Sequence, residues 1–309
     1  MKLLTKAMQD DMARQMVNKA RDVDMCMFNA LDGTMEKEYL LDCLMFYQAK
    51  DGGFQGGLHI DNYNTNSSVY QVYEAFRLLD MLDFDSSCTH ELFDRIISKA
   101  CNYLYNRCQL EDNKWNPNVK SNNDFAHSIL FSYNDENKKL FGYHPTAAIL
   151  GYTLLFNKST KAYYKKALKM IEEILPKFYQ KESLSKYEAI SFGSLYNSLK
   201  KLNLLEEDRN KIKEKLLENA KKNISTNYEN PDLLHPLEAL LYLDTDEFKD
   251  EINDNLDYLV SSVKSFGLWD HIGTWGHNIY PEEDSAMIKW IGAETVNNYF
   301  LLKKYGRIE

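Results

Sequence analysis

The apolar positions of this chain form helical runs of two kinds, which alternate along the sequence. In the run 159–175, residues such as Ala167 and Ile171 share one apolar stripe, while lysines and glutamates occupy the opposite face. The preceding run, 144–156, is apolar on nearly every side, so it must be covered on most of them. A water-facing helix paired with a buried helix predicts two layers of helices.

The same contrast returns along the chain and predicts a series of helical hairpins. Each hairpin has an outer helix followed by an inner one. The expected pairs are 35–48/65–82, 89–108/144–156, 159–179/186–202, 206–223/235–243 and 247–265/284–305, with a sixth in 2–31. Six prolines and no Ser/Gly-rich linker in 309 residues favour a single domain, 1–309. The fold expected is all-α, with an inner barrel of helices inside an outer ring.

A short turn signal recurs between the helices of three hairpins. It consists of a glutamine, an Asp-Gly or Asp-Asn pair and a bulky aromatic residue. It reads Gln48-x-x-Asp51-Gly52-x-Phe54, then Gln109-x-x-Asp112-Asn113-x-Trp115, and in reduced form Gly267-Leu268-Trp269. A repeated turn of this kind marks an array of helical hairpins.

These motifs resemble the Gln-Trp repeats of the α/α-toroid superfamily, which contains terpenoid cyclases and the β-subunits of protein prenyltransferases. DGGFQGG (51–57) followed by TNSSVYQVYEAFRLLDML (65–82) is similar to the prenyltransferase-type repeat. The resemblance implies an α/α-toroid with a central, aromatic-lined cavity, and an apolar or isoprenoid ligand. Because fold does not determine function, two alternatives stay open. They are a carbohydrate-active (α/α)6-barrel hydrolase or lyase, and a non-catalytic binding module of the same fold.

Two strings offer the acid or metal chemistry of those families, and neither is expected to perform it. Asp244-Thr245-Asp246-Glu247 is the nearest match to the Asp-x-Asp-Asp acid of cyclases, but it begins an outer helix, where such residues act as caps. Asp24 and Cys26, with His90, have the ligand spacing of prenyltransferase zinc. Residues two apart on a helix point about 200° apart, so both reach one ion only if the helix breaks. We expect no metal and no cofactor.

The candidate chemistry gathers at the end of the barrel where the turns meet the N-termini of the inner helices. Two long aromatic loops, 116–143 and 267–283, are expected to cover this mouth, as ordered loops often cover binding sites. The candidate catalytic residues are Asp124, His127, Asp270 and His271, and the candidate ligand-binding residues are His59, Tyr143, His144, His235, Trp275 and His277. Helix N-termini add a positive potential there, which favours an anionic group of a ligand.

Composition narrows the choice of partner and compartment. A net charge of −9 argues against nucleic acid and anionic membrane surfaces as partners. No apolar run approaches the length of a membrane span, and the N-terminus is charged too early for a signal peptide. Five cysteines without metal-ligand spacing fit reduced thiols in a cytoplasm. We therefore expect a cytoplasmic protein whose partner is a small molecule, apolar or sugar-like.

Overall fold

Helices form nearly all the regular structure in the computed structural model, which describes residues 1–276 and 279–309. The α-helices within these residues are α1 (Lys6–Lys19), α2 (Asp22–Asp32), α3 (Tyr39–Tyr47), α4 (Val69–Met81), α5 (Glu91–Arg107), α6 (Asp135–Phe141), α7 (Thr146–Phe156), α8 (Ala162–Tyr179), α9 (Lys186–Lys201), α10 (Glu206–Asn223), α11 (Pro236–Ala239), α12 (Lys249–Ser261) and α13 (Glu282–Lys304). The all-α class is confirmed. None of the described helices combines the length and apolar character needed to cross a bilayer.

Helices occupy the expected runs in the expected order along the chain, with two differences. The run 235–243 contains only the four residues of α11, after which the chain turns through a bond from the Leu243 amide to the Leu240 carbonyl. The loop 116–143 is more ordered than the sequence indicates. It contains two 3-10 helices, Lys120–Asp124 and Ile129–Phe131, followed by α6.

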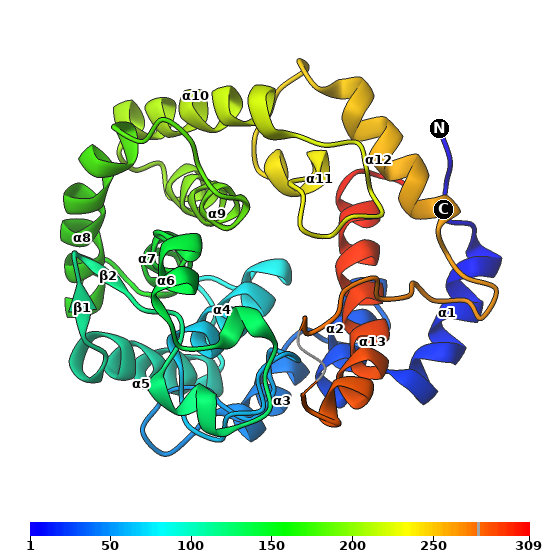
Figure 1. Cartoon of the computed structure of the whole chain (residues 1–309), viewed down its shortest axis with the longest axis horizontal. Coiled ribbons are helices and arrows are strands. Elements are labelled where there is room, and N and C mark those ends of the chain that lie inside the picture. Colours follow the sequence, from blue (N-terminus) through cyan, green and yellow to red (C-terminus); the bar gives the residue numbers. More distant parts are fainter. Residues whose placement is uncertain (277–278) are drawn as a thin grey trace.

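Figure 1 shows α1, α8, α10 and α12 along the outside of the projection, and α4, α7, α9, α11 and α13 nearer its middle. The helices nearer the middle contact one another in chain order, α4 with α7, α7 with α9, and α9 with α11. Both α1 and α2 contact α13, so the two ends of the chain lie together. Leu4 forms a parallel bridge with Ile308, and the Arg307 guanidinium donates to the Lys2 carbonyl at 3.0 Å.

Helix α7 is buried and α8 faces water on one side, as the two hydrophobic patterns predict. All eleven residues of α7 are buried, whereas α8 buries seven of its 18. Small residues let α9 approach α7 closely. A side chain at Gly151 would lie 2.9 Å from the Ser198 hydroxyl and 3.0 Å from the Leu195 Cα. This side of the molecule, formed by α7 and α9, is called the close-packed side below.

The recurring turns use their motif residues as structural parts. The Gln48 side-chain amide donates to the carbonyls of Gly52 and Ile96 at 3.1 and 3.0 Å. Gly52 has a φ of 97°, and a Cβ there would lie 2.4 Å from the Lys99 carbonyl oxygen, so this position requires glycine. Phe54 is fully buried, and Trp115 and Trp269 in the other two turns are almost fully buried. They belong to the core, as predicted.

The second turn carries the two strands of the described residues. Strands β1 (Leu110–Glu111) and β2 (Lys114–Trp115) pair antiparallel around Asp112 and Asn113, whose φ angles are 53° and 60°. Two successive residues in the left-handed region are typical of a tight hairpin turn. The Trp115 amide then donates to the Thr146 hydroxyl at 2.9 Å, which ties the turn to the start of α7.

Candidate functional site

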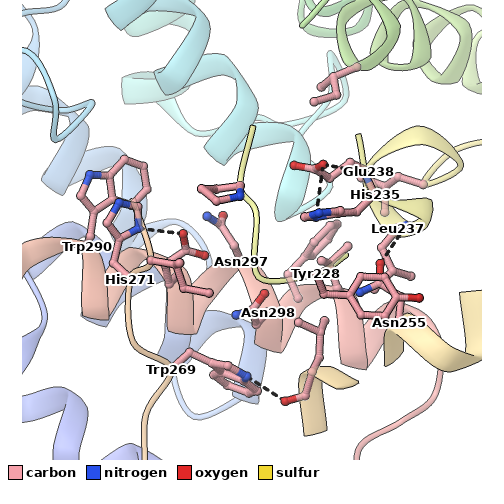
Figure 2. Close-up of a pocket in the computed structure, with 18 of the residues that line it drawn as sticks. Tyr228, His235, Leu237, Glu238, Asn255, Trp269, His271, Trp290, Asn297 and Asn298 are labelled. Carbon is pink, nitrogen blue, oxygen red and sulfur yellow. Dashed lines mark hydrogen bonds and ion pairs between the residues drawn. The ribbon is translucent and has the colours of Figure 1, made fainter. Parts of the chain in front are cut away.

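A cavity of about 440 Å³ lies among α4, α7, α9, α11, α12 and α13. Its volume falls within the range of small-molecule sites, roughly 300–1,000 Å³. Figure 2 shows side chains from α13 and from the segments around it projecting into this shared space. Its aromatic walls include Tyr73, Tyr152, Tyr228, Tyr258, Trp269 and Trp290. This space is called the central cavity below.

One face of α13 presents polar side chains to the central cavity. Trp290, Glu294, Asn297 and Asn298 line it, and their spacing of i, i+4, i+7 and i+8 places them on one side of the helix. The opposite side is buried against α2, where the Tyr299 ring lies 4.9 Å from that of Phe28. Only six of the 23 residues of α13 are buried, fewer than the sequence indicates for an inner helix, because one face borders the cavity.

His271 is held between a carboxylate and an aromatic ring on this face. Its Nδ1 lies 3.1 Å from the Glu294 Oε1, and its ring stacks on Trp290 at 4.7 Å with an interplanar angle of 9°. Because an ionised carboxylate only accepts hydrogen bonds, the neutral ring carries its proton on Nδ1. Nε2 then keeps its lone pair and can take up a proton. An imidazole oriented by a carboxylate is the arrangement of a general base.

The opposite wall contains a second histidine and carboxylate, but their bonding is structural. Glu238 Oε2 accepts from the His235 amide at 3.1 Å, which caps the short helix α11. Glu238 Oε1 lies 2.9 Å from the Lys186 ammonium, which also donates to the carbonyls of Pro231 and Leu233 at 2.7 and 3.1 Å. All three donors of this lysine are therefore occupied.

The guanidinium in the wall belongs to a buried ion pair. Arg77 donates to both carboxylate oxygens of Glu74, at 2.7 and 3.0 Å, and to the Asn297 Oδ1 at 3.0 Å. Burial by itself would raise the pKa of Glu74, but the charge and hydrogen bonds of Arg77 hold that pKa below its ordinary value. The pair therefore stays ionised, and Glu74 neutralises the positive charge of Arg77.

Other polar groups of the wall have spare hydrogen-bonding capacity. Asn255 is only 4% exposed and its Oδ1 accepts from the Leu237 amide at 3.3 Å, while its NH₂ group has no partner among the described residues. The Asn298 side chain forms no hydrogen bond within the same part of the chain, and the buried Tyr228 hydroxyl has none either. Buried polar groups are normally paired, so the amides of Asn255 and Asn298 have capacity for a ligand, while the Tyr228 hydroxyl is enclosed by the protein.

The structure brings three of the candidate residues from the sequence to the central cavity, namely His235, Asp270 and His271. Asp124 is exposed at the end of a 3-10 helix and does not line the cavity. The His127 ring nitrogens lie 2.7 Å from the Phe125 carbonyl and 2.9 Å from the Ser132 hydroxyl, within the loop.

The remaining candidates lie outside the cavity wall. Tyr143 is 5% exposed just before α7. Trp275 is fully buried and donates from Nε1 to the Asp61 carboxylate at 2.8 Å. His277 lies outside the described residues. Of the histidines expected at a common mouth, His235 and His271 line the central cavity.

His59 and His144 lie in a cluster of aromatic rings next to the residues that line the central cavity. Both rings contact Tyr70, at 5.0 and 5.3 Å, and His144 also lies 4.8 Å from the cavity residue Tyr73. Neither ring nitrogen of His144 has a hydrogen-bond partner in the described part of the chain, and burial lowers the pKa of this side chain to about 3. Burial lowers the pKa of His59 as well. His144 is therefore a neutral, buried part of this cluster, whereas His59 is half-buried at its edge.

The strings that resemble cyclase and prenyltransferase motifs have structural partners. Asp244 pairs with Lys200, and the Thr245 hydroxyl accepts from the Glu247 amide at 3.2 Å. Asp24 pairs with Arg21 at 2.7 Å. The His90 Nδ1 accepts from the Leu92 amide at the start of α5, at 3.3 Å. In the described part of the chain, no group of three or more acidic, histidine or cysteine side chains could hold a metal ion.

The polar face of α13 is the part of the site that the sequence reading missed. Glu294, Asn297 and Asn298 stand in a run expected to be buried on most sides, and polar residues are seldom buried without a partner or a role. Their i, i+3, i+4 spacing was the available signal. No family model matches this chain, and no curated protein matches its sequence.

Proposed function

We propose that the chain is an α/α-toroid related to terpenoid cyclases and prenyltransferase β-subunits, and that it binds a small molecule in its central cavity. Three observations support the toroid. Helices lie in an outer and an inner set in Figure 1, the inner helices contact one another in order, and α1 and α2 contact α13 at the other end of the chain. The buried aromatics of the recurring turns support the resemblance to that superfamily.

The observation that carries the binding function is the lining of the cavity. Tyrosine and tryptophan rings share the wall with aliphatic side chains such as Leu241, Leu259 and Leu301. Apolar ligand surface buried against such a wall contributes about 25 cal/mol per Å². A ligand with an apolar, isoprenoid-like body fits this lining best. As an enzyme, the protein would use His271 as the proton acceptor and Glu294 as the group that orients it.

A carbohydrate-active barrel is the second candidate, and the amides of the wall favour it. The NH₂ group of Asn255 and the whole amide of Asn298 are free to bond sugar hydroxyls, while Trp290 supplies a ring at the wall. Sites for polar ligands combine a few such groups with aromatic surface. A protein that uses the same cavity without catalysing a reaction would be a binding module. We expect the protein to be cytoplasmic.

A cavity-filling variant tests this proposal. Asn298→Trp places a large ring in the cavity, and Asn210→Trp on α10, where the side chain is exposed, is the matched control. We expect geraniol to raise the melting temperature of the wild type and the control, but not of Asn298→Trp; at 100 times Kd the stabilisation is about 2.7 kcal/mol. A shift with maltotriose or cellotriose instead would favour the second candidate. No shift with any of them would contradict the proposal.

A further inference from the structure

The positive and the negative side chains of the cavity wall differ in how fully they are already paired within the protein. Both interior cations are occupied by the protein itself, since Arg77 pairs with Glu74 and Lys186 fills its three donor positions. Lys264 also borders the cavity, but it is an exposed side chain in the turn before Trp269. The charge of each interior cation is therefore already matched by a carboxylate of the protein, Glu74 for Arg77 and Glu238 for Lys186.

The acidic groups have unused capacity. A carboxylate offers about four acceptor positions, and Glu294 uses one of them, for His271 Nδ1 at 3.1 Å. Its side chain keeps 29% of its surface accessible at the wall. Asp270 is exposed and, among the residues that the structure describes, accepts only from the adjacent His271 amide, at 3.1 Å. On the same face of α13, Asn298 adds a carbonyl oxygen that accepts no hydrogen bond.

At three of the inner helices, α9, α11 and α13, the positive potential expected from the N-terminus is offset by acidic side chains. Glu188 caps α9, Glu238 caps α11, and Glu282, Glu283 and Asp284 occupy the first turn of α13. Negative charges in the first turn neutralise the partial charge of the free amides. The anionic ligand group expected from the sequence therefore has no favourable position among these helix ends.

We propose that the central cavity takes an organic cation, whose protonated amine lies against Glu294 and Asn298 while its apolar body lies along the tyrosines and leucines of the wall. This inference rests on the proposed binding function and names its ligand class. The second polar contact is the NH₂ group of Asn255, a side chain only 4% exposed, which would donate to an oxygen of the ligand. An isoprenoid diphosphate is the ligand that such a wall disfavours most, because its charge would meet Glu294 and Asp270.

Three probes that share one apolar chain and differ in the charge of the head group test this preference for a cation. They are geranylamine, geraniol and geranyl diphosphate, titrated calorimetrically into the full-length protein at neutral pH. A charge-assisted contact contributes enough that we expect geranylamine to bind about 10- to 100-fold more tightly than geraniol. The diphosphate should bind most weakly.

Glu294→Gln keeps the side-chain shape and an acceptor for His271, and removes the charge. It should weaken geranylamine binding to the level of geraniol and leave geraniol binding unchanged. Glu282→Gln, an exposed carboxylate at the start of the same helix, is the matched control and should leave the ranking intact.

The outcomes separate the two proposals. If geraniol or the diphosphate binds wild type as tightly as the amine does, the cation preference is wrong while the binding function stands. If none of the three binds, the proposed binding function fails and this inference fails with it. The wild-type ranking decides the question even if the variant does not fold.

Discussion

Helices α7 and α13 each close a hairpin, yet their polar side chains are used differently. On the close-packed side, the two threonines of α7 are bonded. The Thr153 hydroxyl donates to the Ile149 carbonyl at 2.8 Å, and the Thr146 hydroxyl accepts from Trp115. On α13, Glu294 has one partner and Asn298 has none among the described residues. Polar groups whose bonding is complete stabilise the fold, whereas unpartnered polar groups that border a cavity can bond a ligand.

The largest effect is expected from removing a buried aromatic residue of the recurring turns. Phe54→Ala and Trp115→Ala each delete a side chain that is at most 1% exposed, and should lower the free energy of unfolding by about 3–5 kcal/mol. Denaturant unfolding measures this loss. A change near zero for either variant would mean that the turns do not join the hairpins through these rings.

The two faces of α13 can be compared at adjacent positions. Tyr299→Ala removes a buried ring packed on Phe28 and should cost about 3–5 kcal/mol of stability. Asn298→Ala removes a side chain without a hydrogen-bond partner in the described structure, and should change the free energy of unfolding by only about 0.5 kcal/mol. Equal losses at the two positions would contradict the assignment of one face to the core and the other to the cavity.

The buried His144 should make the core sensitive to acid. The pKa of His144 is about 3 in the folded chain, against an unfolded value of about 6.5, so the unfolded state takes up the proton first. Stability is therefore complete above about pH 6.5 and falls as the pH drops toward 3, by roughly 2 kcal/mol at pH 5. The lowered pKa of His59 acts in the same direction.

His144→Phe should remove the part of this pH dependence that His144 causes. Phenylalanine keeps a ring in the aromatic cluster and leaves no unpaired nitrogen, so stability at neutral pH should be maintained. Unfolding curves at pH 7.5 and pH 5 measure the difference, with the exposed His90→Phe as the control. The same loss between the two pH values in wild type and His144→Phe would show that His144 is accessible to protons in the folded state.

The helices could be predicted from the sequence because each depends on a pattern of many residues. The run 144–156 can satisfy its apolar surface only by burial, and α7 is buried throughout. The run 235–243 shows the limit of this reasoning. Leu237, Leu240 and Leu243 are buried as their type predicts, but only four residues of the run are helical. Apolar character specifies burial and leaves the backbone conformation open.

The site was harder to predict because it depends on contacts between distant segments. Histidine was a visible signal, and it found His235 and His271, but it also selected His144, whose position in the core follows from the surrounding rings. Glu294 stands 23 positions after His271, so their pairing is a property of the fold. The polar spacing on α13 was a usable signal, because a polar residue in an otherwise apolar helix needs a hydrogen-bond partner.

A crystal structure of the protein grown with geranylamine tests the ligand site most directly. We expect the ligand in the central cavity, with its nitrogen about 2.7–3.2 Å from a carboxylate oxygen of Glu294. Its apolar chain should lie along the rings of Tyr73 and Tyr228. A ligand bound outside the cavity, for example on the 88% exposed Phe46 of α3, would contradict the assignment of α13 as the ligand-binding helix. So would a cavity filled by its own side chains.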